Sequence, residues 1–398
     1  METSHRPMDW ILTATFVLAL WLPLVWTRTE PASLAERRTF APFPQRPRTM
    51  EELVAFPKAF EKWFDDHFGL RHRLVQAYHL MTLAVGSSGS PRVLVGKDGW
   101  LYYTDPKDGN SLEDYRRTDP LTPEELDRWR VALEAKYFWL KEKGIPYLFI
   151  IAPDKHTVYP EYYPSRVRVL GSRSRLEQFM EAMDGSPVPV IDLREPLRRA
   201  KTFGRLYHKT DSHWNDLGAA VAHNTVLAHL SAEVPGLFAR GYGPEDFVWR
   251  QARGGDLARM LSLQDFLKET EVPMLRPGLF RCPDYRENDP MDSEEPALIV
   301  TACRSEGKSA LVFRDSFFTR LRPYITQYFA QTVCTSEPPE VETLERFVRT
   351  YNPDVVLEER VERYLKVVPK RPDPAGDPYR ALRDAVQRGA PGPVSAQR

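Results

Sequence analysis

The stretch IPYLFIIAPDK, residues 145–155, decides the fold of this chain. Its first eight residues are apolar or aromatic, which is typical of a strand buried on both faces. A helix is predicted over residues 122–143, where a capping box opens the pattern and a glycine ends it. Helix, buried strand and polar loop are the parts of a parallel α/β sheet, in which ligands bind beyond the carboxyl ends of the strands. Lys155 and Tyr159 are therefore candidate substrate-binding residues, although a solvated lysine would give the same pattern.

The same order of elements recurs, so the predicted fold class is α/β with a mostly parallel central sheet. No internal repeat is visible, and the segment 244–306 has weak periodicity, so no role is predicted for it. Further strands are predicted at 188–193, 297–302, 309–315 and 354–358, and further helices at 174–183, 195–200, 217–230, 319–329 and 341–349.

Candidate chemistry lies in YHKTDSHWN, residues 207–215. In an extended segment Asp211 and His213 point to the same face, because side chains alternate along a strand. The carboxylate could then fix the imidazole tautomer and stabilise the imidazolium. The candidate nucleophile is Ser316, at the end of an apolar run, where turn N–H groups could hold an oxyanion.

These motifs have other interpretations. Most isolated Asp-x-His pairs are structural, and Ser316 could be a helix N-cap. His208, Asp211 and His213 could bind a metal, but the helical His-x₃-His spacing and paired cysteines of common metal sites are missing. The prediction is therefore no metal and no cofactor.

Composition narrows the function classes. The 398 residues carry 55 Lys+Arg and 55 Asp+Glu, so no nucleic-acid partner is expected. Three cysteines, Cys282, Cys303 and Cys334, permit one disulfide in an oxidising compartment.

Both ends of the chain differ from its middle. Residues 10–26 contain no charge and begin and end with tryptophan, which favours a membrane anchor over a cleaved signal peptide. An aromatic stripe at helical spacing follows and is expected to pack in the core. The predicted divisions are an N-terminal anchor or signal segment, a linker, an α/β domain with insertions and a disordered tail, at residues 1–30, 31–50, 51–366 and 367–398.

Two motifs carry a family resemblance. TDSHW, residues 210–214, followed by Gly218, resembles the Asp-x-His-Trp signature of the alginate O-acetyltransferase AlgJ/AlgX-type SGNH hydrolase-like family, and RDSF, residues 314–317, resembles its serine block. Shorter agreements occur in order between residues 40 and 366, at residues 41–44, 65–71, 95–101, 152–155, 159–160 and 352–356.

The resemblance implies an SGNH-hydrolase-like three-layer α/β/α fold, preceded by an N-terminal membrane helix. It implies Ser316 as nucleophile, His213 as general base and Asp211 as the orienting carboxylate. Arg314, where many of the wider superfamily have glycine, and Trp214 become candidate substrate-binding residues. Because little chain follows residue 366, an additional carbohydrate-binding module is not expected.

The expected function is O-acetylation of an exported polysaccharide in the periplasm by a protein anchored in the inner membrane. The acetyl donor is expected to be supplied by a membrane acyl-transfer partner. Two alternatives remain open at this point: a carbohydrate acetylesterase, and a non-catalytic polysaccharide-binding subunit of a secretion complex.

Overall fold

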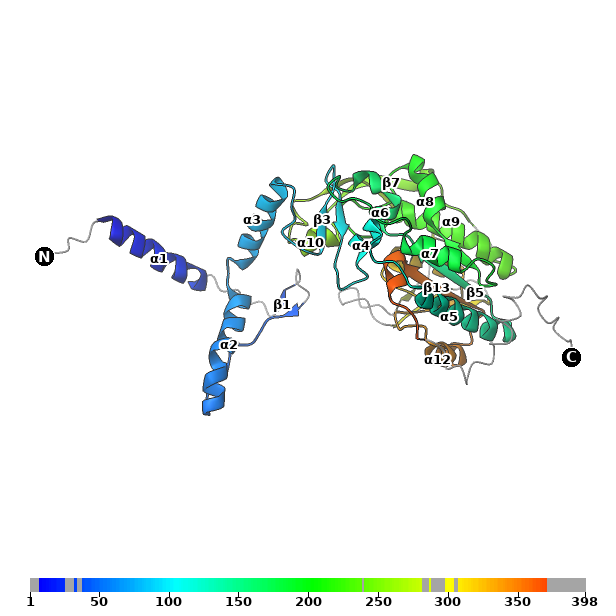
Figure 1. Ribbon diagram of the computed structural model, residues 1–398, viewed down its shortest axis with the longest axis horizontal. Coiled ribbons are helices and arrows are strands. Elements are labelled where there is room, and N and C mark those ends of the chain that lie inside the picture. Colours follow the sequence, from blue (N-terminus) through cyan, green and yellow to red (C-terminus); the bar gives the residue numbers. More distant parts are fainter. Residues whose placement is uncertain are drawn as a thin grey trace.

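The computed structural model describes residues 7–25, 32–33, 38–237, 240–280, 286–287, 298–303 and 307–370 (Figure 1). Its centre is a seven-stranded sheet with the strand order β6-β5-β13-β11-β12-β10-β9. The first five strands in this order are parallel, and β10 and β9 add antiparallel strands at one edge. The sheet is therefore mostly parallel, as predicted. In spatial order its strands are Val190–Asp192, Tyr147–Ala152, Val355–Val361, Ser309–Phe313, Gln331–Thr335, Leu298–Ala302 and Arg286–Glu287.

Strand β5 is buried along its whole length because helices cover both faces of the sheet. Leu148 and Ile150 pack in the core under α8, α9 and α11, whereas Phe149 and Ile151 pack in the core under α5, α7 and α12. Successive side chains of a strand point to opposite faces, so both cores need apolar residues and the strand shows no polar alternation. The result is a three-layer α/β/α body. The covering helices are α5 (Pro123–Glu142), α7 (Arg175–Ala182), α8 (Arg194–Ala200), α9 (Asp216–Glu233), α11 (Phe318–Thr326) and α12 (Val341–Tyr351).

Several short elements lie beside this body. The antiparallel hairpin of β3 (Val93–Val95) and β4 (Leu101–Tyr103) packs on α10 (Asp256–Met260) through a small apolar core. A second hairpin pairs β7 (Phe247–Ala252) with β8 (Glu269–Leu275). The weakly periodic segment 244–306 thus supplies a hairpin, a short helix and the antiparallel strands β9 and β10. The remaining short helices are α4 (Ser111–Arg116) and α6 (Lys155–Val158).

The N-terminal helices are α1 (Pro7–Val25), α2 (Met50–His67) and α3 (Arg71–Ala84), and a small ladder joins β1 (Ala32–Ser33) to β2 (Arg38–Thr39). Among the described residues, no helix combines the length and apolar character needed to cross a membrane, so the expected membrane helix is not found there. The predicted tail lies outside the described residues from position 371 onward.

The aromatic stripe of α2 differs from expectation. We predicted core packing, but Phe60 is 38% exposed and Phe56, Trp63 and Phe64 are only partly buried. These rings contact one another and Phe43 instead of the sheet. The aromatic residues do lie on a helix, as their spacing predicts. The surface that this helix face contacts depends on the tertiary structure.

Lys136 of α5 forms a buried ion pair with Glu358 of β13, and the Tyr147 hydroxyl donates to the same carboxylate over 2.7 Å. Lys136→Met removes the buried cation and leaves the Glu358 carboxylate with only the longer contact to Arg360, at 3.5 Å, as an ion pair. We expect a loss of about 3–5 kcal/mol in the free energy of unfolding, measured by chemical denaturation. Lys136→Met combined with Glu358→Gln should regain part of this loss, and a neutral effect of the single change would contradict the assignment.

Candidate active site

Asp211, His213 and Ser316 meet at the carboxyl edge of the sheet. His213 Nε2 lies 2.8 Å from Ser316 Oγ, and His213 Nδ1 lies 2.7 Å from Asp211 Oδ1. Ser316 stands in the turn between β11 and α11 and is partly exposed, while the other two residues come from the loop before α9. In this geometry the imidazole can take the hydroxyl proton while the carboxylate stabilises the imidazolium.

The loop before α9 is closed on itself. Tyr207 and Trp214 form an antiparallel bridge across it. Asn215 then caps α9, because its side-chain oxygen accepts a hydrogen bond from the Gly218 N–H over 3.1 Å. The loop therefore presents Asp211 and His213 from a short, fixed connection between a bridge and a helix start.

The side chain of Lys155 holds the backbone of this loop. Its ammonium donates to the carbonyl oxygens of Asp211, His208 and Lys209 over 2.7, 3.1 and 3.1 Å. Burial lowers the pKa of Lys155 to about 8, although the neighbouring carboxylate of Asp256 opposes the shift. The residue predicted for substrate binding is 3% exposed, and its charge is directed at backbone oxygens of the loop.

Trp214, also predicted for substrate binding, is completely buried. Its indole N–H donates to the Phe317 carbonyl oxygen over 3.1 Å, and the two rings pack edge to face. Phe317 in turn contacts the His213 ring, with 4.8 Å between centroids. These contacts join the loop of the base to the turn of the nucleophile.

A second carboxylate, Asp256 at the start of α10, lies beside the imidazole. Its Oδ2 is 3.5 Å from His213 Nδ1 and accepts a hydrogen bond from the Ser212 hydroxyl. Asp256 also accepts from the Ser212 N–H over 2.7 Å, and its own N–H donates to Asp211 over 2.9 Å. A Cβ on Gly255 would lie 2.3 Å from the Asp211 Cβ, so only glycine permits this approach.

The charges around His213 favour its protonated form. Burial lowers its pKa, but the hydrogen bond to Asp211 and the charges of Asp211 and Asp256 outweigh burial and leave the pKa raised. Burial would raise the pKa of Asp211, yet His213 holds it well below its usual range. Burial and repulsion from Asp211 raise the pKa of Asp256. Asp211 is therefore the carboxylate that stays ionised against the imidazole.

The turn that carries Ser316 is fixed by a pair of acids. Asp315 accepts the N–H of Phe317 over 2.9 Å and that of Val361 over 2.6 Å, while its own N–H donates to Glu359 over 3.1 Å. Burial and the charge of Asp315 raise the pKa of Glu359. Because Asp315 occupies the Phe317 N–H, the Ser316 N–H is the turn's candidate oxyanion donor.

Arg314 precedes this pair and is 2% exposed. Its backbone N–H donates to the Thr335 carbonyl oxygen over 2.9 Å, in continuation of the pairing between β11 and β12. The candidate substrate-binding residues Lys155, Trp214 and Arg314 are thus all buried around the triad.

Parts of this chain are similar to known proteins. Residues 93–282 match the family model described as "SGNH hydrolase-like domain, acetyltransferase AlgX". Two relatives named "Probable alginate O-acetylase AlgJ", from Pseudomonas syringae pv. tomato and Pseudomonas aeruginosa, are 27% and 26% identical over 57% and 53% of this chain. The family model and these relatives support the AlgJ/AlgX-type SGNH hydrolase-like family for this chain.

The matched part is limited in length. The alignments cover 56% and 51% of these two relatives, so the chain spans about half the length of the curated relatives it matches. Among solved structures, Bacillus cereus PatB1 superposes with a TM-score of 0.51 at 16% identity, covering 69% of this chain and 96% of PatB1. At that identity the likeness concerns the fold alone.

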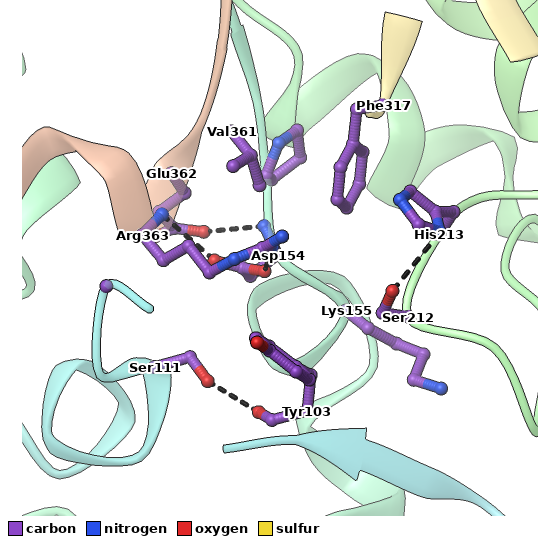
Figure 2. Close-up of polar contacts among 12 residues, drawn as sticks. Tyr103, Ser111, Asp154, Lys155, Ser212, His213, Phe317, Val361, Glu362 and Arg363 are labelled. Atoms are coloured by element: carbon purple, nitrogen blue, oxygen red, sulfur yellow. Dashed lines mark hydrogen bonds and ion pairs between the residues drawn. The ribbon is translucent and has the colours of Figure 1, made fainter. Parts of the chain in front are cut away.

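An arginine that sequence reasoning missed lies next to the triad. Arg363 follows β13, is 4% exposed and donates to Asp154 over 2.7 Å. Its guanidinium packs over the rings of Phe317 and Tyr103, 5.6 and 5.2 Å from their centroids. Figure 2 shows it directed toward the side on which Phe317 and His213 lie. The charge of this cation opposes the carboxylates and so limits the rise in the pKa of His213.

Tyr159 lies apart from the triad contacts. Its hydroxyl accepts a hydrogen bond from the Leu206 N–H over 2.9 Å, and its ring packs on Trp100 with 4.6 Å between centroids. Burial raises the pKa of Tyr159 to about 12, so the phenol stays protonated. It supports the segment leading into the catalytic loop and also lines a surface hollow.

The structure places three possible metal ligands close together near the triad. Asp211, His213 and Asp256 bring ligand atoms within 4.8 Å of one another. Both ring nitrogens of His213 already face partners, one a carboxylate and the other the Ser316 hydroxyl. His208 instead faces Glu269, with 3.5 Å between Nδ1 and Oε2. The arrangement fits a proton relay better than a metal centre.

Asp211→Asn should change the pH dependence in a defined direction. The carboxylate raises the pKa of His213, so its removal lowers that pKa and moves the acid limb of the rate profile to lower pH. The rate should fall by about 10³–10⁴-fold, since the tautomer and the imidazolium lose their support. The measurement is kcat/KM for a small acetyl ester against pH, and an unshifted acid limb would argue against the contact.

Asp256→Asn tests the second carboxylate. Loss of its charge should also move the acid limb to lower pH, with a smaller fall in kcat/KM of roughly tenfold. Asp265→Asn is the matched control, because Asp265 is an exposed acid in the turn that follows α10. Identical pH profiles for the two variants would mean that Asp256 only shapes the loop.

Proposed function

We propose that this protein is an O-acetyltransferase that acts on an exported polysaccharide through an acetyl-serine intermediate. The observation that carries the proposal is the hydrogen-bonded series from Asp211 through His213 to the partly exposed hydroxyl of Ser316. The names of the AlgJ relatives support acetyl transfer and an alginate-like acceptor.

The first step would form the acetyl-enzyme. Ser316 Oγ attacks the carbonyl carbon of the acetyl donor while its proton passes to His213 Nε2. The tetrahedral intermediate carries a negative oxygen, for which the Ser316 N–H is the available turn donor. Its collapse breaks the bond to the leaving group, which takes the proton from His213.

The second step would transfer the acetyl group. A sugar hydroxyl attacks the acetyl-serine carbonyl, His213 takes the hydroxyl proton, and the returning Ser316 oxygen recovers a proton from His213. Water in place of the sugar would make the same residues an esterase. The distinction therefore depends on acceptor binding and on the exclusion of water, not on the triad.

The proposal also includes the location and the donor. A disulfide at Cys303 supports an oxidising compartment such as the periplasm. There the acetyl group would have crossed the membrane first, so a membrane acyl-transfer protein is the proposed donor partner.

Acetyl transfer can be measured directly. The protein is incubated with a small acetyl ester and a mannuronate oligosaccharide, and both protein and sugar are analysed by mass spectrometry. We expect acetylated sugar and an acetyl group on Ser316, with both lost in Ser316→Ala and His213→Ala. The exposed Ser165→Ala is the control and should behave like the parent.

The possible results separate the alternatives. Free acetate without acetylated sugar would favour the esterase. Neither product, from a protein that retains its circular dichroism spectrum, would refute the catalytic role and favour a binding subunit.

A further inference from the structure

A surface hollow of about 430 Å³ lies beside the segment that leads into the catalytic loop. Its volume is within the range of small-ligand sites, roughly 300–1,000 Å³. The hollow is lined by the β7/β8 hairpin, by residues 201–209, by Trp100 just before β4 and by residues 159–162. The triad does not line this hollow, so its residues are not explained by the acyl chemistry.

Two aromatic side chains are left half exposed in the hollow. Trp249 of β7 is 48% exposed, and Phe203, just after α8, is 52% exposed. Trp249 pairs in register with Pro273 across the hairpin, and both line the hollow. Gly204 borders the indole, since a Cβ built there would lie 3.7 Å from the Trp249 ring, in ordinary van der Waals contact. Exposed aromatic faces gathered in a concave site indicate a ligand that stacks.

The other aromatic rings that line the hollow pack against one another. Trp100 and Tyr162 stack with 4.6 Å between centroids and an interplanar angle of 9°. The Lys201 ammonium lies over the Tyr159 ring and pairs with Glu161. These contacts position the aromatic rings before a ligand binds, which lowers the cost of binding.

Hydrogen-bond donors lie around the platform, together with the acids Glu161 and Glu271. Lys209 donates to the Asp98 carbonyl oxygen over 3.1 Å, a neutral partner. Arg205 pairs with Glu269 over 3.0 Å and also donates to the Thr270 carbonyl oxygen. Donors at the rim of an aromatic platform match the hydroxyl and carboxylate oxygens of a sugar ring.

The hollow and the catalytic loop share the same supports. Glu269, the first residue of β8, accepts the Thr210 N–H over 2.7 Å, directly before Asp211. Lys209 contributes its side chain to the hollow and its carbonyl oxygen to the Lys155 ammonium under the loop. A chain bound in the hollow would thus lie on the segment that positions the base.

We propose that this hollow binds sugar rings of the acceptor polysaccharide, with Trp249 as the stacking platform and Lys209 and Arg205 as donors. The inference rests on the proposed function, because it names the place where that function's acceptor is held. Binding here holds the polymer while a neighbouring sugar presents its hydroxyl to the acetyl-serine.

The test measures binding without chemistry. The full chain carrying Ser316→Ala is titrated with a mannuronate oligosaccharide, and the Kd is measured by calorimetry. Adding Trp249→Ala should weaken binding by about tenfold, and Trp249→Phe should restore most of it, because a flat ring is retained. Phe266→Ala is the matched control, since Phe266 is 56% exposed but lies outside the hollow. Its Kd should equal that of the parent.

Charge selectivity is read from the same titrations. Lys209→Gln should weaken binding of the mannuronate oligosaccharide more than binding of a neutral oligosaccharide of equal length. If Trp249→Ala binds as tightly as the Phe266→Ala control, or if no oligosaccharide binds, the hollow is not the acceptor site. These titrations need no acetyl transfer. The hollow can therefore fail to bind the acceptor while the acetyl-serine chemistry is correct, and it can bind the acceptor while that chemistry is wrong.

Discussion

The position of His213 depends on a buried cation. Three carbonyl oxygens of the catalytic loop converge on the Lys155 ammonium, which has almost no contact with solvent. Buried carbonyl groups without donors would be costly, so the loop conformation and the lysine require each other. The same loop conformation aims Asp211 at one imidazole nitrogen and leaves the other for Ser316. Loss of this single support would remove the alignment on which the acyl chemistry rests.

Three neighbouring strands bring the remaining parts together. β5, β13 and β11 lie side by side in the sheet and end at the same edge. Lys155 follows the first, Arg363 the second and Ser316 the third, so residues far apart in sequence become neighbours. This is the reason why a parallel sheet suits such a site: each strand end contributes one polar group above a fully apolar core.

The sequence predicted the elements better than their surroundings. The apolar run at 147–152 identified β5, because a strand under two helical layers cannot alternate. Asp211 and His213 followed from the period of an extended segment, and Ser316 followed from its place at the end of an apolar strand. The family resemblance strengthened their assignment to one site, since no local pattern encodes a contact across 103 residues. Asp256 and Arg363 were missed. Gly255 before Asp256 was the available signal, because its lack of a Cβ permits the approach to Asp211.

Burial was the property least accessible from sequence. Trp214 and Arg314 were predicted to face substrate but are buried, because neighbours in sequence to a catalytic residue often support it from behind. The aromatic stripe of α2 was predicted to be buried but is partly exposed. Helical period gives the direction of a face, whereas its partner comes only from the tertiary structure.

The central claim is that Ser316 is a nucleophile activated by His213. A fluorophosphonate probe that reacts with activated serines, followed by peptide mapping, tests it most directly. The account predicts one adduct, on Ser316, that disappears in a folded His213→Ala variant. An adduct on another serine, or none on the folded parent protein, would contradict it.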